Sequence, residues 1–279
     1  MIWTQIAGQK IHFSVQLPEL AFVQIEGGSI NTPAIPEPQA VTVRAHGWLA
    51  NEHRDLEIWS APPGILLRTR GGKDIYISPD GGLIIQKDSE ELNAIEREAI
   101  LGPALLLALA ARGTWCLHAS AAMWRGQVFV FLGESGRGKS TLAAFLARQP
   151  GWMWVADDIL PFTVDANGAH VWPRFPQLKV SLDSQPGLRL PESLPANRFF
   201  LLGESAKEEA PTVREISGGQ ASQALLAHTA STRLFDERLL ADHLRACAEA
   251  ARHISVYHLN YPKRMDVLPG VKGILENLC

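Results

Sequence analysis

The most informative segment of the chain is GESGRGKST, which comprises Gly133, Glu134, Ser135, Gly136, Arg137, Gly138, Lys139, Ser140 and Thr141. Its first eight residues fit the pattern G-x-x-x-x-G-K-S. The apolar run QVFVFL precedes it at 127–132, and a helical pattern follows from Ser140 to Arg148. Glycines let successive backbone N–H groups curl around phosphate oxygens, and the helix N-terminus adds partial positive charge. The segment therefore predicts a phosphate-binding loop between a strand and a helix.

The residue types in this loop predict a nucleoside triphosphate and a divalent cation as cofactors. Lys139 would reach the β- and γ-phosphates, and the Ser140 hydroxyl would ligate Mg²⁺. Two other nucleotide sites are weaker alternatives, because the chain lacks the N-K-x-D pattern of guanine recognition and lacks G-x-G-x-x-G after a strand for NAD. The alternative is a glycine turn that connects strand to helix and binds nothing.

Two adjacent carboxylates supply a second candidate element of the site. The apolar run at 152–156 ends in Asp157 and Asp158, as expected of a buried strand beside a phosphate loop. Mg²⁺ needs a carboxylate at such a strand end, directly or through water. One aspartate would hold the metal while the other accepts a proton from an incoming hydroxyl. The alternative is a pair of solvated turn residues.

His118 is the third candidate. It lies in WCLHASAAM, residues 115–123, which we expect to form one strand that pairs, through a turn at Gly126, with the strand before the loop. That pairing would bring His118 near the phosphates. A lone histidine is more often structural than catalytic, so the residue alone predicts little.

The first third of the chain has a different pattern. Strands are expected at 65–69, 75–78 and 83–86, separated by glycine turns, and they predict a small, mostly antiparallel β unit. From Ser89 the spacing becomes helical as far as about Arg112, with a kink at Pro103. We therefore expect a β-rich unit over 1–88 and a nucleotide-binding domain over 89–279.

The segment LHASAAMWRGQVFVFLGESGRGKSTLAAFL, together with the later WVADD, resembles the HPr kinase/phosphorylase family over about Leu117 to Ile159. That family has a histidine, a hairpin, G-x-S-G-x-G-K-S and Ala-Asp-Asp in the same order. The resemblance implies an α/β fold with a P-loop kinase core related to phosphoenolpyruvate carboxykinase. It also implies phosphate transfer from ATP to a serine hydroxyl, with His118 beside the acceptor and the two aspartates sharing metal and base duties.

The chain departs from that family downstream of the aspartates, where VWPRFPQLKVSLD replaces its E-I-R-G-L-G-like signature. This stretch, the ending VYHLNYPKR and the length look more like the shorter HPr-kinase-related proteins of peptide pathways, among them lasso-peptide kinases. The resemblance then implies a serine-bearing peptide or protein as partner. Either Arg174 and Lys179 or Lys263 and Arg264 would then meet phosphate or an acceptor carboxylate. The alternative for each is a solvated surface cation, which is the commoner role.

A competing pattern resembles ABC-transporter ATPases. ISGGQ at 216–220 is like their signature, and LFDE at 234–237 is like their Asp-Glu strand end. Apolar residues from Leu234 to Cys247 recur at helical spacing, however, which predicts that Asp236 and Glu237 lie on a helix and that Ser217 caps another. The competing functions are therefore an ATPase without a phosphoacceptor and a nucleotide-binding module without turnover.

Composition excludes several classes of protein. The charge balance, 26 Lys and Arg against 29 Asp and Glu, gives a net charge of −3, which argues against binding nucleic acid by bulk electrostatics. Three well-separated cysteines exclude a disulfide framework and a cysteine zinc site within the chain and favour a reducing, cytoplasmic compartment. The longest apolar run, 101–111, is too short to span a membrane. Homo-oligomerisation is left open.

Overall fold

The computed structural model describes residues 2–27, 33–86, 91–176, 190–206 and 209–278. Within these residues the chain forms two compact units. The first contains the residues up to Trp115 together with Ser231–Asp242, and the second contains the remainder. Both mix strands with helices, which confirms the expected α/β class. The boundary predicted near residue 88 falls on residues outside the described part and stays a prediction.

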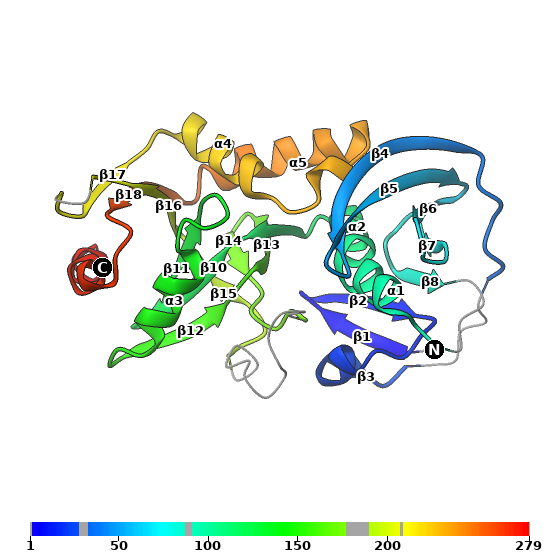
Figure 1. The fold of residues 1–279 in the computed structure, drawn as a ribbon, viewed down its shortest axis with the longest axis horizontal. Coiled ribbons are helices and arrows are strands. Elements are labelled where there is room, and N and C mark those ends of the chain that lie inside the picture. Colours follow the sequence, from blue (N-terminus) through cyan, green and yellow to red (C-terminus); the bar gives the residue numbers. More distant parts are fainter. Residues whose placement is uncertain (1, 28–32, 87–90, 177–189, 207–208, 279) are drawn as a thin grey trace. The chain divides into compact units, whose positions relative to one another are not determined.

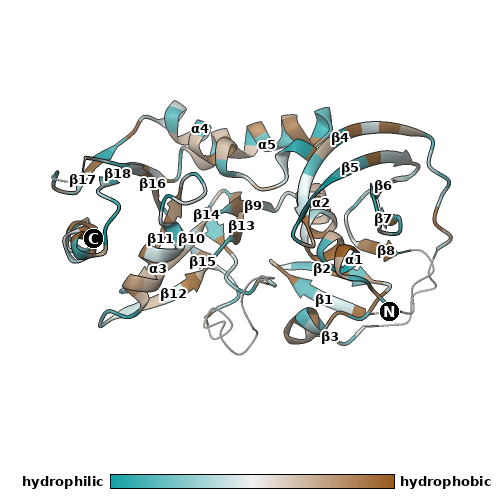
Figure 2. Cartoon of the chain, viewed as in Figure 1, coloured by the Kyte–Doolittle hydropathy of each residue, from teal (hydrophilic) through white to brown (hydrophobic). Residues whose placement is uncertain are grey.

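The first unit is built on one eight-stranded sheet. Its strands are β1 (Ile2–Ile6), β2 (Gln9–Phe13), β3 (Gln24–Ile25), β4 (Ala40–Leu49), β5 (Glu52–Ala61), β6 (Gly64–Thr69), β7 (Ile75–Ile77) and β8 (Leu83–Gln86), with a 3-10 turn η1 (Pro18–Val23). The order is β3-β1-β2-β8-β7-β6-β5-β4, and only the β2–β8 pair is parallel. The mostly antiparallel β unit is thus confirmed. Along β4, hydrophilic and hydrophobic residues alternate, as expected of a strand with one wet face (Figure 2).

A kinked helical segment follows this sheet in the chain. It comprises α1 (Ala94–Ala99), a π-turn η2 (Ile100–Ala104) and α2 (Leu105–Ala111), and the sheet curls beside it (Figure 1). Asn93 caps α1 in a capping box with Glu96. The kink expected at Pro103 is present, because Gly102 takes φ −98° and ψ −105° just before the proline, which cannot donate an N–H.

The second unit contains the six-stranded sheet that carries the predicted phosphate loop. Its strands are β10 (Ser120–Trp124), β11 (Gln127–Leu132), β12 (Trp152–Ala156), β16 (Arg198–Glu204), β17 (Thr212–Glu215) and β18 (Ser255–Tyr261). The order is β12-β10-β11-β16-β18-β17. The three strands β11, β16 and β18 are parallel, and β10, which runs the other way, separates β11 from β12.

Two helices, α3 (Lys139–Ala147) and α6 (Leu268–Asn277), contribute to the main core of this unit, and the short turn η6 (Met265–Val267) leads into α6. From α3 the core takes Leu142 and Leu146, and from the strands it takes Phe129, Phe131 and Phe200. Each of these five side chains is fully buried. Burying such a side chain is worth about 1.5–3 kcal/mol, so the core fixes the strand from which the loop leaves and the helix into which it runs.

A second, four-stranded sheet corrects one sequence expectation. It consists of β9 (Trp115–His118), β13 (Ile159–Asp165), β14 (Gly168–Val171) and β15 (Leu194–Pro195), in the order β15-β14-β13-β9. The single strand expected over 115–123 is wrong: it breaks at Ala119, whose N–H donates to the Asp158 carbonyl at 3.2 Å. His118 therefore ends β9 and does not lie on β10, the strand that pairs with β11.

The helices that bear on the ABC-like reading are α4 (Gly218–His228) and α5 (Glu237–Ala250), with a 3-10 turn η5 (Thr232–Leu234) between them. Ser217 caps α4 in a capping box with Gln220, as expected. Asp236 precedes α5 and accepts the N–H of Leu239 at 2.8 Å, so it caps the helix and does not lie within it. Neither Asp236 nor Glu237 follows a strand, which removes the ABC-like metal position.

No helix in the described part of the chain is long and apolar enough to cross a membrane. Cys116 and Cys247 are both buried free thiols. Burial raises the pKa of the Cys247 thiol to about 12, so this thiol is protonated and unreactive near neutral pH. The third cysteine, Cys279, lies outside the described residues.

Candidate phosphoryl-transfer site

The predicted phosphate loop joins the end of β11 at Leu132 to the start of α3 at Lys139. Gly133, Gly136 and Gly138 have φ of +146°, +79° and +91°. L-residues with a Cβ rarely adopt these conformations, so the three glycines are needed for the path of the loop. The backbone thus accounts for the glycine spacing of the motif.

The start of α3 suits an anion. Gly138 occupies the N-cap position and offers no side-chain acceptor, and the first turn holds no acidic residue. The first N–H groups of α3 are therefore without a side-chain cap, in the position where a helix N-terminus binds phosphate. Ser135, Ser140 and Thr141 are exposed at this end of the helix, so their hydroxyls are open to a ligand from solvent.

The Lys139 side chain folds back onto its own loop and is hydrogen-bonded to it. Its side chain is only 6% exposed, and its ammonium donates to the Gly133 carbonyl at 2.7 Å and to the Glu134 carbonyl at 3.3 Å. Burying an ammonium is costly unless donors are satisfied, and the two carbonyls provide that. A phosphate seated in the loop would offer the same ammonium charged oxygen acceptors, which bind it more strongly than neutral carbonyls.

Arg137, expected to face the phosphates, makes an ion pair in this structure. Its guanidinium donates to Glu204 at the end of β16, with Nη1 2.8 Å from Oε2. Both side chains are about half exposed, at 42% and 51%. Surface pairs of this kind contribute at most about 1 kcal/mol, so a phosphate would compete readily for the guanidinium.

Asp157 and Asp158 lie beyond the end of β12, which is an edge strand of the sheet and is separated from β11 by β10. The acids nevertheless share the edge of the sheet with the loop. Antiparallel pairing sets Ala121 of β10 opposite Ala156, while Ser120 lies opposite Phe131. Since β11 and β12 both run against β10, their carboxyl ends meet at the start of β10, and the loop and the acids emerge there together.

Ser120 is the residue of this site that sequence reasoning missed. It is fully buried, and its hydroxyl donates to Asp157 Oδ1 at 2.5 Å. A short charge-assisted bond of this kind fixes the rotamer of the carboxylate. One signal for it exists in the sequence: a lone hydroxyl, two residues after His118, at the head of a strand of alanines. That signal becomes informative only once the register is known.

Asp158 is placed by an unusual backbone. Its φ is +70°, and the turn is closed by the Ile159 N–H, which donates to the Asp157 carbonyl at 3.0 Å. Such conformations cost a non-glycine residue roughly 1–3 kcal/mol and cluster at functional sites. The turn directs the Asp158 carboxylate towards His118, with Oδ1 3.6 Å from Nδ1. His118 is thus adjacent to the acids, although by a route other than the expected strand pairing.

The oxygen donors at this edge fit a magnesium ion. Mg²⁺ binds through one or two carboxylates and keeps several waters, and it does not require a cage built only of protein groups. Asp157, Asp158 and Ser140 are donors of the right chemistry, and they would hold the ion against the phosphates. The described residues contain no cluster of three or more His, Cys, Asp or Glu that would indicate a different, protein-enclosed metal site.

The other candidate cations are less well placed. Arg174 donates twice to the Leu190 carbonyl, at 3.0 and 2.8 Å, which indicates a structural role for it. Lys263 is exposed, and Arg264 pairs with Asp266 at 3.3 Å. Lys179 lies outside the described residues.

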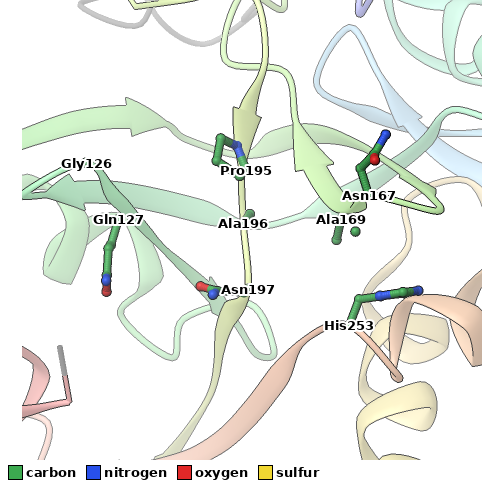
Figure 3. A pocket seen from close by; sticks show the side chains of 9 residues that line it. Gly126, Gln127, Asn167, Ala169, Pro195, Ala196, Asn197 and His253 are labelled. Carbon is green, nitrogen blue, oxygen red and sulfur yellow. The ribbon is translucent and has the colours of Figure 1, made fainter.

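A hollow of about 270 Å³ lies elsewhere in the second unit (Figure 3). Gln127 at the start of β11 and Asn197 just before β16 line it, together with Asn167 and His253. It is therefore at the amino ends of the parallel strands, whereas ligands of parallel sheets bind at the carboxyl ends, where the phosphate loop is. The hollow is not the candidate site.

Comparison with known proteins gives one structural match to report. The Hpr(Ser) kinase/phosphatase from Coxiella burnetii aligns at 14% sequence identity and a TM-score of 0.35, covering 59% of this chain and 94% of that one. A superposition at this TM-score does not by itself define a fold or a function. No protein-family model and no curated protein matches the chain.

Proposed function

We propose that the chain is an ATP-dependent kinase that transfers the γ-phosphate to a serine hydroxyl of a peptide or protein. The observation that carries the proposal is the convergence at one sheet edge of the glycine loop, buried Lys139 and the carboxylates of Asp157 and Asp158. Phosphoryl transfer depends mainly on positioning and charge neutralisation, and these are the groups it needs.

In this proposal each residue has a defined task. The loop N–H groups and Lys139 hold the β- and γ-phosphates, and Ser140 with an aspartate holds Mg²⁺, which neutralises the developing charge. The other aspartate accepts the proton of the serine hydroxyl as its oxygen bonds to the γ-phosphorus. The bond from that phosphorus to the bridging oxygen breaks, and ADP leaves with the electron pair. Either Asp157 or Asp158 can serve as the base.

The acceptor is proposed more narrowly from the sequence resemblance. A lasso-type precursor peptide with a serine near its C-terminus is the substrate class that the resemblance implies, in a cytoplasmic setting without nucleic acid or membrane partners. We also include self-association, because the related kinases assemble as oligomers.

The test is a transfer assay with γ-labelled ATP, Mg²⁺ and serine peptides. Lys139→Ala and Asp157→Asn should each reduce transfer by at least about a hundredfold, since each removes a charge that meets the transferring group. Lys272→Ala, in an ion pair on α6, and Asp165→Asn, a strand-end aspartate of β13, are matched controls that should retain activity.

The destination of the label separates the proposed kinase from its alternatives. Label on the peptide supports the kinase. Free labelled phosphate with no labelled acceptor indicates an ATPase, and ATP binding without turnover indicates a nucleotide-binding module. Transfer at the wild-type rate by both loss-of-charge variants would refute the assignment of the site.

A further inference from the structure

A second histidine lies against the site from a distant part of the chain. His228 is the last residue of α4, and Leu117 and Thr229 form an isolated antiparallel bridge. The Ala230 N–H donates to the Cys116 carbonyl at 2.7 Å, which continues the same pairing. His118 and His228 are the sequence neighbours of this bridged pair, so the bridge brings the end of α4 beside the histidine that lies 3.6 Å from Asp158.

This bridge is anchored by buried hydrogen bonds. The Thr229 hydroxyl donates to the Leu225 carbonyl at 2.9 Å and lies 2.8 Å from His243 Nε2 of α5. The same His243 Nε2 also lies 3.2 Å from Cys247 Sγ, so two neighbours hold this ring beside Thr229. Burial lowers the pKa of His243 to about 4, so its ring is neutral. These contacts hold Thr229 in place at the end of α4, and with it the backbone of the adjacent His228.

His228 lies within electrostatic range of three ionisable groups of the second unit. Its pKa is lowered first by burial, then by the positive charges of Lys139 and His118, while Glu134 acts in the opposite direction. All three charged groups belong to the candidate site, two of them to the phosphate loop. His228 therefore interacts electrostatically with both the loop and His118. A neutral imidazole there carries one N–H donor and one acceptor.

We propose that His228 donates a hydrogen bond to the phosphoryl group in transfer, between the phosphate loop and the histidine beside the acceptor. This inference rests on the proposed kinase function and adds to it a catalytic residue that reaches the site from α4. The donor matters most when charge spreads over the γ-phosphate oxygens, so its contribution belongs to the transition state more than to ATP binding.

The experiment measures kcat, KM for the acceptor and ATP affinity of purified His228→Ala, with His228→Gln as the variant that keeps an N–H donor. His170→Ala, a half-buried histidine on β14, is the matched control. We expect His228→Ala to lower kcat roughly 10- to 1,000-fold with ATP affinity changed less than about threefold. His228→Gln should recover part of the loss, and added imidazole should restore activity to the alanine variant.

Two results would overturn the inference: wild-type kcat in His228→Ala, or a loss of kcat that imidazole and glutamine both fail to restore. A melting temperature measured on each variant identifies a folding defect. If His228→Ala is destabilised, the kcat of His228→Gln decides whether an N–H donor at this position is needed. ATP hydrolysis is measured in parallel. Hydrolysis of ATP without transfer to a peptide refutes the kinase but still tests His228, because the kcat of hydrolysis in each variant can be compared with that of the wild-type chain. A wild-type chain that neither transfers phosphate nor hydrolyses ATP refutes both the kinase and the role of His228.

Discussion

The hydroxyl of Ser120 donates to Asp157 Oδ1 at 2.5 Å, and this bond joins the first residue of β10 to the acid that follows β12. Ser120 is also opposite Phe131, one residue before the end of the strand that enters the phosphate loop. A single buried side chain thus connects the two halves of the proposed site. Partners of this kind orient a metal-binding carboxylate, and their loss typically costs about 10–100-fold in metal affinity or activity.

Ser120→Ala should therefore weaken the binding of Mg²⁺ more than it destabilises the fold of the chain. We expect the Mg²⁺ concentration for half-maximal turnover to rise about tenfold or more, because Asp157 loses the bond that fixes its rotamer. Titration of Mg²⁺ at saturating ATP measures it. An unchanged titration midpoint would show that Asp157 does not bind the metal or does not need this support.

Gly136→Ala and Gly126→Ala form a matched pair for the loop. Their φ values are +79° and +78°, and a Cβ at either would meet nothing within 4 Å, so both substitutions cost only backbone strain, about 1–2 kcal/mol. Gly136 lies in the loop and Gly126 in the β10–β11 turn. We expect similar losses of thermal stability, while only Gly136→Ala weakens ATP binding, by about tenfold or more in a calorimetric titration. Equal ATP affinities in the two variants would contradict the phosphate loop.

Glu204→Gln tests the ion pair made by Arg137. The carboxylate competes with a bound phosphate for the guanidinium, so its removal should tighten ATP binding by a few fold, with a change in stability below about 1 kcal/mol because the pair is half exposed. Arg137→Ala should weaken ATP binding. If both variants shift the affinity in the same direction, the pair is structural and Arg137 does not meet the phosphates.

The buried His243 predicts a pH dependence of stability. Its pKa is lowered from 6.5 to about 4 in the folded chain, so the unfolded chain binds more protons between these values. The contribution of His243 to the free energy of unfolding should be complete above pH 6.5. It should decline as the pH falls towards 4, by at most about 1.4 kcal/mol per pH unit. Urea unfolding at several pH values measures the slope. His243→Gln should flatten it, and an equal slope in both chains would assign the effect to other groups.

Local features of the sequence determined the glycine loop, the helix kink and the helix cap of this protein. GESGRGKS predicted the loop because positive φ at Gly133, Gly136 and Gly138 is a property of single residues. The kink at Pro103 and the cap at Ser217 were predictable for the same reason, since a missing N–H and a side-chain acceptor act within a few residues. Helical periodicity likewise predicted that Asp236 and Glu237 lie on a helix, which holds for Glu237, the first residue of α5, while Asp236 caps that helix from outside.

Only the tertiary structure decided how the site is assembled. The break at Ala119 places His118 in another sheet, and at this break the Ala119 N–H donates to the carbonyl of Asp158, which is distant in the sequence. The register that sets Ser120 beside Asp157, and the bridge that pairs Leu117 with Thr229, likewise join residues far apart in the chain. Pairings of this kind are chosen by the packing of whole strands and by the burial it allows, because a one-residue slip reverses which face each side chain takes. Single-residue propensities carry no such information. The sequence alone therefore predicted the chemistry of the loop, whereas the tertiary structure determined which residues lie beside it.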